Sequence, residues 1–567
     1  MNVRYIATKL LLRLVNSSFI PYKQIRTVLY DAMLDPDSNK ELCLQASDFY
    51  IHDLPLLPKE ESSIRMHAGY LPINPENDSA LFFWHFAKKF IGDKSRTVIW
   101  LNGGPGQSSL IGAWTEIGPF RFLNETTIVA NNGSWHLYTN LLFIDQPIGT
   151  GFSYTDKGAF IKGLDKMADQ FLSFLDRYVE IFPELLQDDI YLAGESFAGQ
   201  YIPYIAQAIL EKRSLFKLRG LLIGNGWIDP VSTYNSYMPF AIKNNLVTND
   251  SELYTNITRL VAICQDILSK QVHIFESECY SILRLIMSDG LVNENFIGNE
   301  TDLCINPHDI RLTAMQPGCG MLGPPDFDYV SNYLNRPDVL SSIHVNGKKS
   351  NWSSIEASVL SAFISTHSEP SINLLPDLLR QIPIVLFSGE YDLICNHLAT
   401  ENMLDGMTWN DKTGFNLGNE TVAPIDPWIV EGETAGFIQY ARNLTYILFH
   451  NAGHMVPYNQ GRRSRAMLHQ FIQLNLTHSN NQTMENNNTG VNPIMHRYFK
   501  HFILIVFTVI ITGIALTGII RYFACKRQQS VITVPYHSPN LFRSKQQPTT
   551  YTLLNRNRDV LDDKISA

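Results

Sequence analysis

The sequence has few cysteines, few charges and no internal repeat, and each shortage excludes a class of protein. Only 7 of the 567 residues are cysteine and none form a C-x2–4-C pair, which argues against a zinc module. Charged residues are 17% of the chain and hydrophobic residues 45%, a balance typical of a folded globular protein. The net charge of −9 argues against a nucleic-acid-binding protein.

Charge is missing altogether from residues 502–520, which read FILIVFTVIITGIALTGII. Nineteen residues at about 1.5 Å each reach across the hydrocarbon core of a bilayer. Core helices of soluble proteins rarely have so long an uncharged run, and basic residues flank this one. The sequence therefore predicts one transmembrane helix over 502–520.

Sequons for N-glycosylation are absent after this run, although thirteen precede it. Residues 521–567 instead carry eight basic and three acidic side chains, whereas residues 1–520 sum to −14. Both asymmetries predict a type I protein with a lumenal body, a polar stalk over 476–501 and a disordered cytosolic tail over 521–567. The first sequon is at Asn16, and the candidate glycosylation sites are the other twelve: Asn77, Asn124, Asn132, Asn249, Asn256, Asn299, Asn351, Asn419, Asn443, Asn475, Asn481 and Asn487.

The first 30 residues lack the feature that a lumenal protein should begin with. They contain five basic residues and no acid before Asp31, but charges interrupt every apolar stretch, so no signal-peptide core is evident. Three interpretations remain: a misassigned start of the coding sequence, an atypical signal, or a mitochondrial transit peptide. The sequons and the apolar run favour the first two.

Four cysteines cluster within 56 residues of one another. An oxidising lumen favours two disulfides among them, with three possible connectivities. The disulfide candidates are Cys264, Cys279, Cys304 and Cys319.

Short apolar runs that end in a polar or glycine turn alternate with segments of helical spacing. This rhythm predicts an α/β protein with a mostly parallel sheet covered on both faces. Residues 229–367 lack the rhythm and are interpreted as an inserted helical lid between core parts at 31–228 and 368–475. The predicted strands lie in 96–102, 140–147, 189–196, 218–226, 382–390 and 444–454.

The third of these strands ends in GESFAG, which has the form of a nucleophile elbow. Small residues flank Ser196, so a strained turn can present its hydroxyl at the apex. Ala198 stands where the strict G-x-S-x-G pattern has glycine, and a helix-capping serine is the alternative interpretation.

Asp392 and His454 follow the last two predicted strands, which gives the chain order Ser, Asp, His. This is the order that an α/β-hydrolase sheet requires. We therefore predict that Ser196 is the nucleophile and His454 the general base, and that Asp392 orients the imidazole.

Six sequence blocks resemble those of the serine carboxypeptidase family, in sequence and in spacing, over about 68–473. The blocks are WLNGGPGQSSL (100–110), DQPIGTGFSY (145–154), GESFAGQYIP (194–203), GNGWIDP (224–230), GEYDLICN (389–396) and AGHMVPYNQ (452–460). The resemblance implies an α/β-hydrolase fold, an acyl-enzyme mechanism, and no cofactor or metal.

The resemblance also implies roles for residues around the predicted triad. The backbone N–H groups of Gly104 and Phe197 would form the oxyanion hole. The substrate carboxylate would be bound by Asn102, Gly103, Glu116 and Glu195. Two buried glutamates suit this role if one keeps its proton and donates a hydrogen bond, which predicts activity at acidic pH.

Some positions depart from the family pattern, and two more are tentative pocket residues. Gln107 stands where the family usually has cysteine, and no cysteine occurs near 352–357 where its partner is expected, so one disulfide is inferred to be lost. Asn459 replaces the usual acid after the histidine block. Cys395 matches a family cysteine that lines the substrate site, with a packed buried thiol as the alternative, and Met455 could offer apolar contact because it follows His454 directly.

Within the family, the blocks and the anchor resemble the fungal branch that processes pheromone precursors in the late Golgi. That resemblance implies removal of C-terminal Lys and Arg from peptides and proprotein fragments. Tyr551 begins a Tyr-x-x-apolar signal of the kind that cytosolic sorting adaptors read. The alternatives are a broad-specificity carboxypeptidase, or an acyltransferase or esterase on the same fold.

Overall fold

The structure is a computed structural model, and it describes residues 44–474 with short gaps. The gaps are 59–62, 75–77, 91–93, 156–159, 290–302, 316–317, 322, 346–350, 365–367 and 419–420. Predictions for 1–30, the stalk 476–501, the apolar run 502–520 and the tail 521–567 lie outside the described residues, as does Tyr551. So do the sequons Asn16, Asn77, Asn299, Asn419, Asn475, Asn481 and Asn487.

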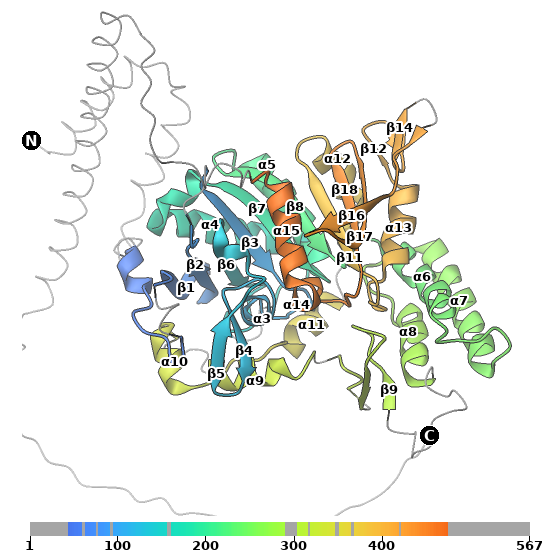
Figure 1. Ribbon diagram of the computed structural model, residues 1–567, viewed down its shortest axis with the longest axis horizontal. Coiled ribbons are helices and arrows are strands. Elements are labelled where there is room, and N and C mark those ends of the chain that lie inside the picture. Colours follow the sequence, from blue (N-terminus) through green and yellow to red (C-terminus); the bar gives the residue numbers. More distant parts are fainter. Residues whose placement is uncertain are drawn as a thin grey trace, which may run out of the picture. The chain divides into compact units, whose positions relative to one another are not determined.

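A ten-stranded sheet of order β1-β2-β6-β3-β7-β8-β11-β18-β17-β16 forms the centre of the described chain (Figure 1). Its six middle strands are parallel, which confirms the predicted mostly parallel sheet. These are β6 (Asn140–Asp145), β3 (Arg96–Leu101), β7 (Asp189–Glu195), β8 (Lys217–Gly224), β11 (Ile384–Gly389) and β18 (Leu444–Phe449).

The sheet is extended at both edges by antiparallel strands that the sequence patterns did not predict. β1 (Met66–Asn74) and β2 (Ser79–Phe86) flank β6, whereas β17 (Glu433–Ala441) and β16 (Asp426–Val430) flank β18. Smaller strands lie outside the sheet: β4 (Phe120–Asn124), β5 (Thr127–Ala130), β12 (Thr408–Trp409), β13 (Lys412–Thr413), β14 (Asn416–Gly418) and β15 (Thr421–Val422).

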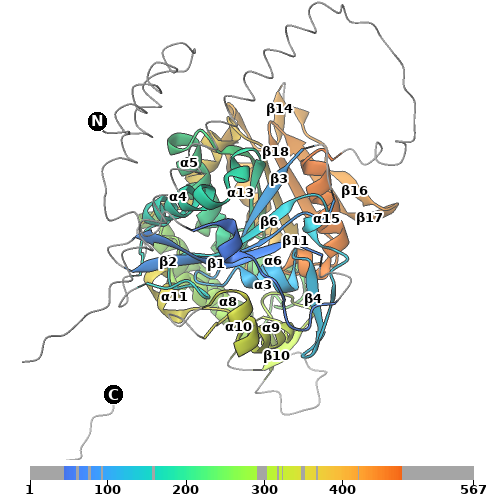
Figure 2. The same cartoon turned by 90° about the vertical axis from the view of Figure 1, so that its left-hand side faces the viewer.

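Helices cover both faces of the sheet, with α4 and α5 on one side of the strands and α15 on the other (Figure 2). Alternate strand residues face the two cores: Ile99 packs with α4 and α5, and Trp100 packs with α3 and α15. The helices that cover the sheet and those next to them are α3 (Leu110–Thr115), α4 (Leu164–Ile181), α5 (Ala198–Lys212), α12 (Leu375–Leu379), α13 (His397–Gly406), α14 (Val456–Asn459) and α15 (Gly461–Phe471).

Between β8 and β11 the chain is mainly helical, and it also contains a small hairpin. Its helices are α6 (Pro230–Lys243), α7 (Glu252–Lys270), α8 (Ser277–Asp289), α9 (Asp326–Leu334), α10 (Pro337–Ser342) and α11 (Ala357–Ile364). The hairpin is formed by β9 (Leu303–Ile305) and β10 (Thr313–Met315). Disulfides join Cys264 to Cys279 and Cys304 to Cys319, so one bond links α7 to α8 and the other links β9 to the segment that follows β10.

A backbone pairing joins the two segments for which the resemblance implies a lost disulfide. Gln107 forms an antiparallel bridge with Ile355. Beside it, Ser108 N donates to Ser354 O and Glu356 N donates to Gly106 O, each at 2.9 Å. The two segments therefore remain joined by hydrogen bonds in place of a covalent link.

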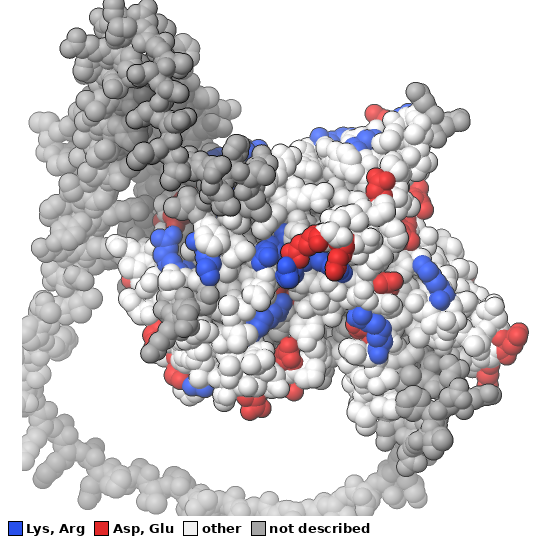
Figure 3. Space-filling model, viewed as in Figure 1, with Lys and Arg blue, Asp and Glu red and all other residues white. Residues whose placement is uncertain are grey.

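Acidic and basic side chains are interleaved over α15 and the neighbouring β16–β17 hairpin (Figure 3). Arg462 pairs with Glu431 at 2.7 Å and Arg463 with Glu433 at 3.1 Å. Exposed pairs of this kind contribute little to stability, and they leave no single-sign field on this face.

Two predictions about membranes and glycans can be compared with the described residues only in part. No helix among them has both the length and the apolar character needed to cross a bilayer. Five sequon asparagines there are exposed, namely Asn124, Asn132, Asn249, Asn351 and Asn443, and Asn256 is half-buried. The Asn443 side-chain amide donates to Leu379 O at 3.1 Å, so glycan attachment at this nitrogen would require that bond to break.

Candidate active site

Ser196 lies in the sharp turn between β7 and α5, with a φ angle of 61°. A non-glycine residue rarely adopts this conformation, which raises its side chain out of the end of the sheet. Gly194 is needed just before the turn, because a Cβ there would approach Leu101 O to 2.1 Å. The strained serine of the predicted elbow is therefore built into the backbone.

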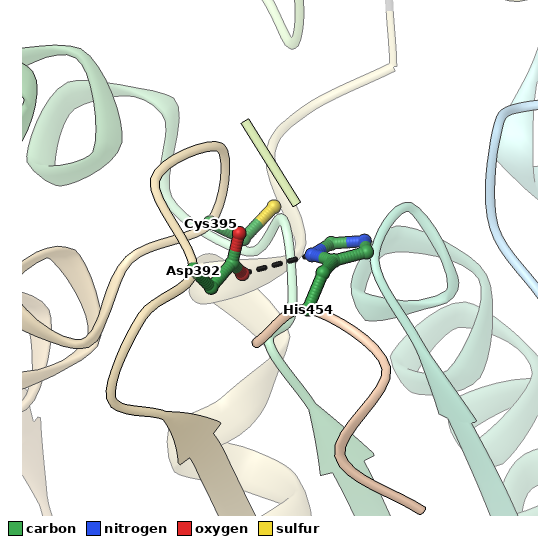
Figure 4. Close-up of side chains that lie close together, drawn as sticks. All are labelled: Asp392, Cys395 and His454. Carbon is green, nitrogen blue, oxygen red and sulfur yellow. Dashed lines mark hydrogen bonds and ion pairs between the residues drawn. The ribbon is translucent and has the colours of Figure 1, made fainter. Parts of the chain in front are cut away.

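Asp392 and His454 meet at the ends of the adjacent strands β11 and β18 (Figure 4). His454 Nδ1 lies 2.8 Å from Asp392 Oδ2, and the two side chains are only 6% and 0% exposed. Burial raises the pKa of Asp392, while its hydrogen bonds with His454 and with the N–H of Ile394 oppose that rise. The pair can hold Nδ1 protonated and leave Nε2 to accept a proton.

Asn225 supports this pair through hydrogen bonds to the backbone, a role that the sequence motifs did not predict. Its amide nitrogen donates to the carbonyls of Gly453 and His454 at 3.1 and 2.6 Å, and its oxygen accepts from Gly389 N at 2.9 Å. Because Asn225 is fully buried, these bonds tie the histidine loop to β11. An asparagine between two glycines at a strand end, in GNGWIDP, was the available signal.

Asn459 holds the same loop from its other side. Its side-chain oxygen accepts from Gly453 N at 2.9 Å. The residue that departs from the family pattern after the histidine block therefore still supports the backbone next to His454.

The backbone N–H groups of Gly104 and Phe197 have no protein acceptor among the described residues, and Gly104 lines the same cavity as Ser196. Gly103 lies against them, since a Cβ there would approach Phe197 N to 2.3 Å and Ser196 Cβ to 2.9 Å. Only glycine permits this close approach. The arrangement leaves two fixed N–H donors from which a developing oxyanion could accept hydrogen bonds.

The Asn102 side chain has one permitted orientation. Its oxygen accepts from Trp100 Nε1 at 2.9 Å and from Gly112 N at 3.0 Å. Its amide nitrogen must therefore point to the other side, where it donates to Glu116 Oε1 and Glu195 Oε1, each at 3.2 Å. One asparagine thus joins the two glutamates that the resemblance grouped with it.

Glu116 and Glu195 are both buried and their carboxyls are hydrogen-bonded to each other; apart from that contact, their Oε2 atoms have no protein partner in the described part of the chain. Burial raises the pKa of each, and for Glu195 the neighbouring Glu116 raises the pKa further. The pair therefore retains a proton at a pH where an exposed glutamate has lost it. A protonated carboxyl with a free oxygen can donate a hydrogen bond to an incoming carboxylate.

A cavity of about 660 Å³ opens beside these groups. Met455 lines it, whereas Cys395 is buried and is not among its lining residues. The lining includes Gly104, Glu195, Ser196, His308, Phe327, Asp328, Ile394, His454, Met455 and Tyr458. The strained serine, the histidine and one buried carboxyl therefore share a single space.

The thiol of Cys395 lies close to the Asp392–His454 pair, so that three potential metal-ligand atoms lie within 4.8 Å of one another. The 2.8 Å bond between Asp392 and His454 accounts for two of the three. Burial raises the pKa of the Cys395 thiol well above its ordinary value, which disfavours the thiolate that metals bind. The cluster fits an acid–base pair with a packed neighbouring thiol better than a metal centre.

Known proteins match most of the described chain. The family model for serine carboxypeptidases matches residues 55–474. Two relatives named pheromone-processing carboxypeptidase KEX1 are similar to this chain. That of Fusarium vanettenii is 45% identical over 76% of this chain and 70% of its own length. That of Aspergillus terreus is 46% identical over 76% of this chain and 69% of its own length.

A crystal structure agrees with these sequence matches. It is that of Kex1(Δ)p, a prohormone-processing carboxypeptidase from Saccharomyces cerevisiae. The match has 34% identity and a TM-score of 0.70, and it covers 79% of this chain and 98% of that one. Together with the site geometry, these matches show that the chain belongs to the serine carboxypeptidase family.

Proposed function

We propose that this serine carboxypeptidase removes lysine and arginine from the C-terminal ends of peptides and proprotein fragments, at acidic pH, in the late secretory pathway. The observation that carries the proposal is the buried pair Glu116 and Glu195, joined by Asn102 beside Ser196. A site with a protonated carboxyl selects a free C-terminal carboxylate over an amide or ester end.

The proposed reaction passes through an acyl-enzyme. Ser196 Oγ attacks the last peptide carbonyl while His454 Nε2 accepts its proton, and the oxyanion binds to the N–H groups of Gly104 and Phe197. His454 then returns the proton to the leaving amine, and the terminal residue departs. Water repeats the sequence on the ester and frees Ser196.

Preference for a basic terminal residue is supported by one acidic side chain in the lining of the cavity, Asp328. Asp328 is exposed and has no basic partner among the residues described. By contrast, Asp309 is neutralised by Arg311, whose Nη2 lies 2.5 Å from Asp309 Oδ2. Two relatives are named pheromone-processing and prohormone-processing carboxypeptidases, which supports an action on peptide precursors.

The proposed location rests on the sequence outside the described residues. The uncharged run 502–520 would anchor the chain, and the sequons before it would place the catalytic body in the lumen. The cytosolic tail would make Tyr551 accessible to sorting adaptors. Late Golgi residence would also supply the acidic pH that the glutamate pair requires.

The function is tested with the detergent-solubilised full chain at about pH 5.5. We expect it to release Lys and Arg from free-acid peptides at least about tenfold more efficiently than Leu or Phe, and to leave amidated twins uncut. Mass spectrometry of the products measures both ratios. Asp328→Asn should lower kcat/KM for the basic peptides and leave that for the Leu peptide unchanged.

Two results would contradict parts of the proposal separately. Equal cleavage of amidated and free-acid peptides would exclude the carboxypeptidase reaction and favour a general hydrolase. Equal release of Lys and Leu from free-acid peptides would keep the reaction but favour the broad-specificity alternative.

The pH dependence of KM tests the glutamate pair. We expect KM for a free-acid peptide to increase about tenfold per pH unit once the pair deprotonates, because the ionised pair repels the substrate carboxylate. Glu195→Gln offers an amide donor at every pH and should flatten this increase. An identical KM–pH profile in wild type and variant would contradict the role of Glu195.

The stability of the same variant provides the folding control. Because burial raises the folded-state pKa of Glu195, the protonated form stabilises the fold at low pH, and that contribution is lost as pH rises through the raised pKa. Glutamine cannot ionise, so the variant does not lose this stability as the pH rises. Glu195→Gln should therefore melt no lower than wild type at pH 4 and higher than wild type at pH 8, in a thermal melt.

A further inference from the structure

The loop of the β9–β10 hairpin, residues 306–310, lies against the loop that carries Asp392. Pro307 O accepts from Leu393 N at 2.9 Å and from Ile394 N at 3.1 Å. On the other side of Asp392, Ile310 N donates to Tyr391 O at 3.0 Å. The residues before and after the buried acid are thus bonded to the same loop of the insertion.

The same loop also reaches the histidine. His308 O accepts from His454 N at 2.6 Å. Gly453 makes this approach possible, because a Cβ at that position would lie 2.4 Å from His308 O. One short segment between β8 and β11 therefore holds the two loops that meet in the Asp392–His454 hydrogen bond.

The His308 side chain adds a contact with the base itself. Its ring centroid lies 4.9 Å from that of His454, with the planes tilted by 44°. Its Nδ1 lies 3.1 Å from Gly320 O, so Nδ1 carries the proton and donates. The ring is thereby fixed as a wall of the cavity on one side of His454.

The charge of His308 matters at this distance. Packing of the surrounding protein and the neighbouring His454 lower the pKa of His308 to about 3. The ring is therefore neutral at the acidic pH proposed for the reaction, and it does not repel His454 when that residue accepts the proton of Ser196. A charged side chain at the same place would oppose that step.

We propose that residues 306–310 position the Asp392–His454 pair. Within this segment, His308 is a positioning residue that keeps His454 Nε2 aligned with Ser196 Oγ. The inference rests on the proposed triad. It assigns His308 an effect on the chemical step, since a displaced base slows proton transfer without altering how the terminal carboxylate binds.

The test compares His308→Ala and His308→Phe with wild-type full chain. The alanine variant should lower kcat about tenfold or more, and it should slow sulfonylation of Ser196 by phenylmethanesulfonyl fluoride by a similar factor. The Ki of free lysine, which reports carboxylate binding, should change less than twofold. Phenylalanine retains a planar ring against His454 and should restore kcat to within about threefold of wild type.

His344→Ala is the matched control, because this half-buried histidine also bonds through Nδ1 to a backbone carbonyl, Ala68 O at 3.0 Å, and does not line the cavity. It should leave all three measurements unchanged. If His308→Ala does not fold, His308→Leu, which fills the volume without a planar ring, replaces it in the comparison with phenylalanine.

Two outcomes would overturn the inference. One is wild-type kcat in His308→Ala. The other is a change in KM and Ki with an unchanged sulfonylation rate, which would make His308 a substrate-contacting wall only. A variant Ser196→Ala that kept its activity would instead refute the triad, so the two failures are distinguishable.

Discussion

Replacement of Ser196 by alanine is expected to lower kcat by about five to six orders of magnitude. The reason is geometric. The Ser196 backbone has a φ angle of 61°, and Ser196 lines the same cavity as His454. Without the Ser196 hydroxyl, no acyl-enzyme forms, and the remaining oxyanion donors and carboxylate site support only a residual reaction with water.

Substrate binding provides the internal control for this variant. Asn102, Glu116 and Glu195 are untouched, so the affinity for a free-acid peptide, measured by calorimetry, should stay within about threefold of wild type. Ser214→Ala, at an exposed position on the surface, should keep full activity. A loss of activity below about a hundredfold in Ser196→Ala would mean that another group attacks the peptide.

Asp392→Asn is expected to lower kcat by about four orders of magnitude. Asparagine can still accept the hydrogen bond from Ile394 N, so the loop should keep its conformation. Its amide would, however, donate to His454 Nδ1 and so favour the tautomer with hydrogen on Nε2. That tautomer cannot accept the proton of Ser196.

The stability of Asp392→Asn distinguishes a tautomer effect from unfolding. Because the folded-state pKa of Asp392 is raised, its protonated form stabilises the fold at low pH, and this contribution is lost as pH rises through the raised value. Asparagine stays neutral throughout, so the melting temperature at pH 7 should stay close to that of wild type. A large fall in melting temperature that paralleled kcat would contradict the tautomer explanation.

Local patterns predicted the inner strands and the triad because each depends on neighbours in the chain. The six apolar runs form the parallel strands β3, β6, β7, β8, β11 and β18. The three triad residues could be placed because parallel strands end at the same edge of a sheet. The strands β1 and β2 were not among the predicted strands, although β2 is as continuously buried as the predicted strand β3.

Long-range contacts account for the site residues that the patterns missed. Asn225 acts on His454, which lies 229 positions away in the sequence, through one buried amide. His308 belongs to an insertion with no regular alternation of strands and helices, and its contacts with His454 indicate its role. The orientation of Asn102 likewise depends on Trp100 and Gly112, which no motif connects to the glutamates.

By itself, the sequence determined the α/β class, the order of the strand-end residues and the resemblance to serine carboxypeptidases. Each of these rests on short apolar runs or contiguous blocks that can be recognised within a short stretch of the chain. Only the tertiary structure decided that Glu116 and Glu195 share one asparagine in a buried space, and that the β9–β10 hairpin braces the Asp–His pair. Burial and hydrogen-bond direction arise from residues far apart in the chain, and they set which carboxyls keep their protons.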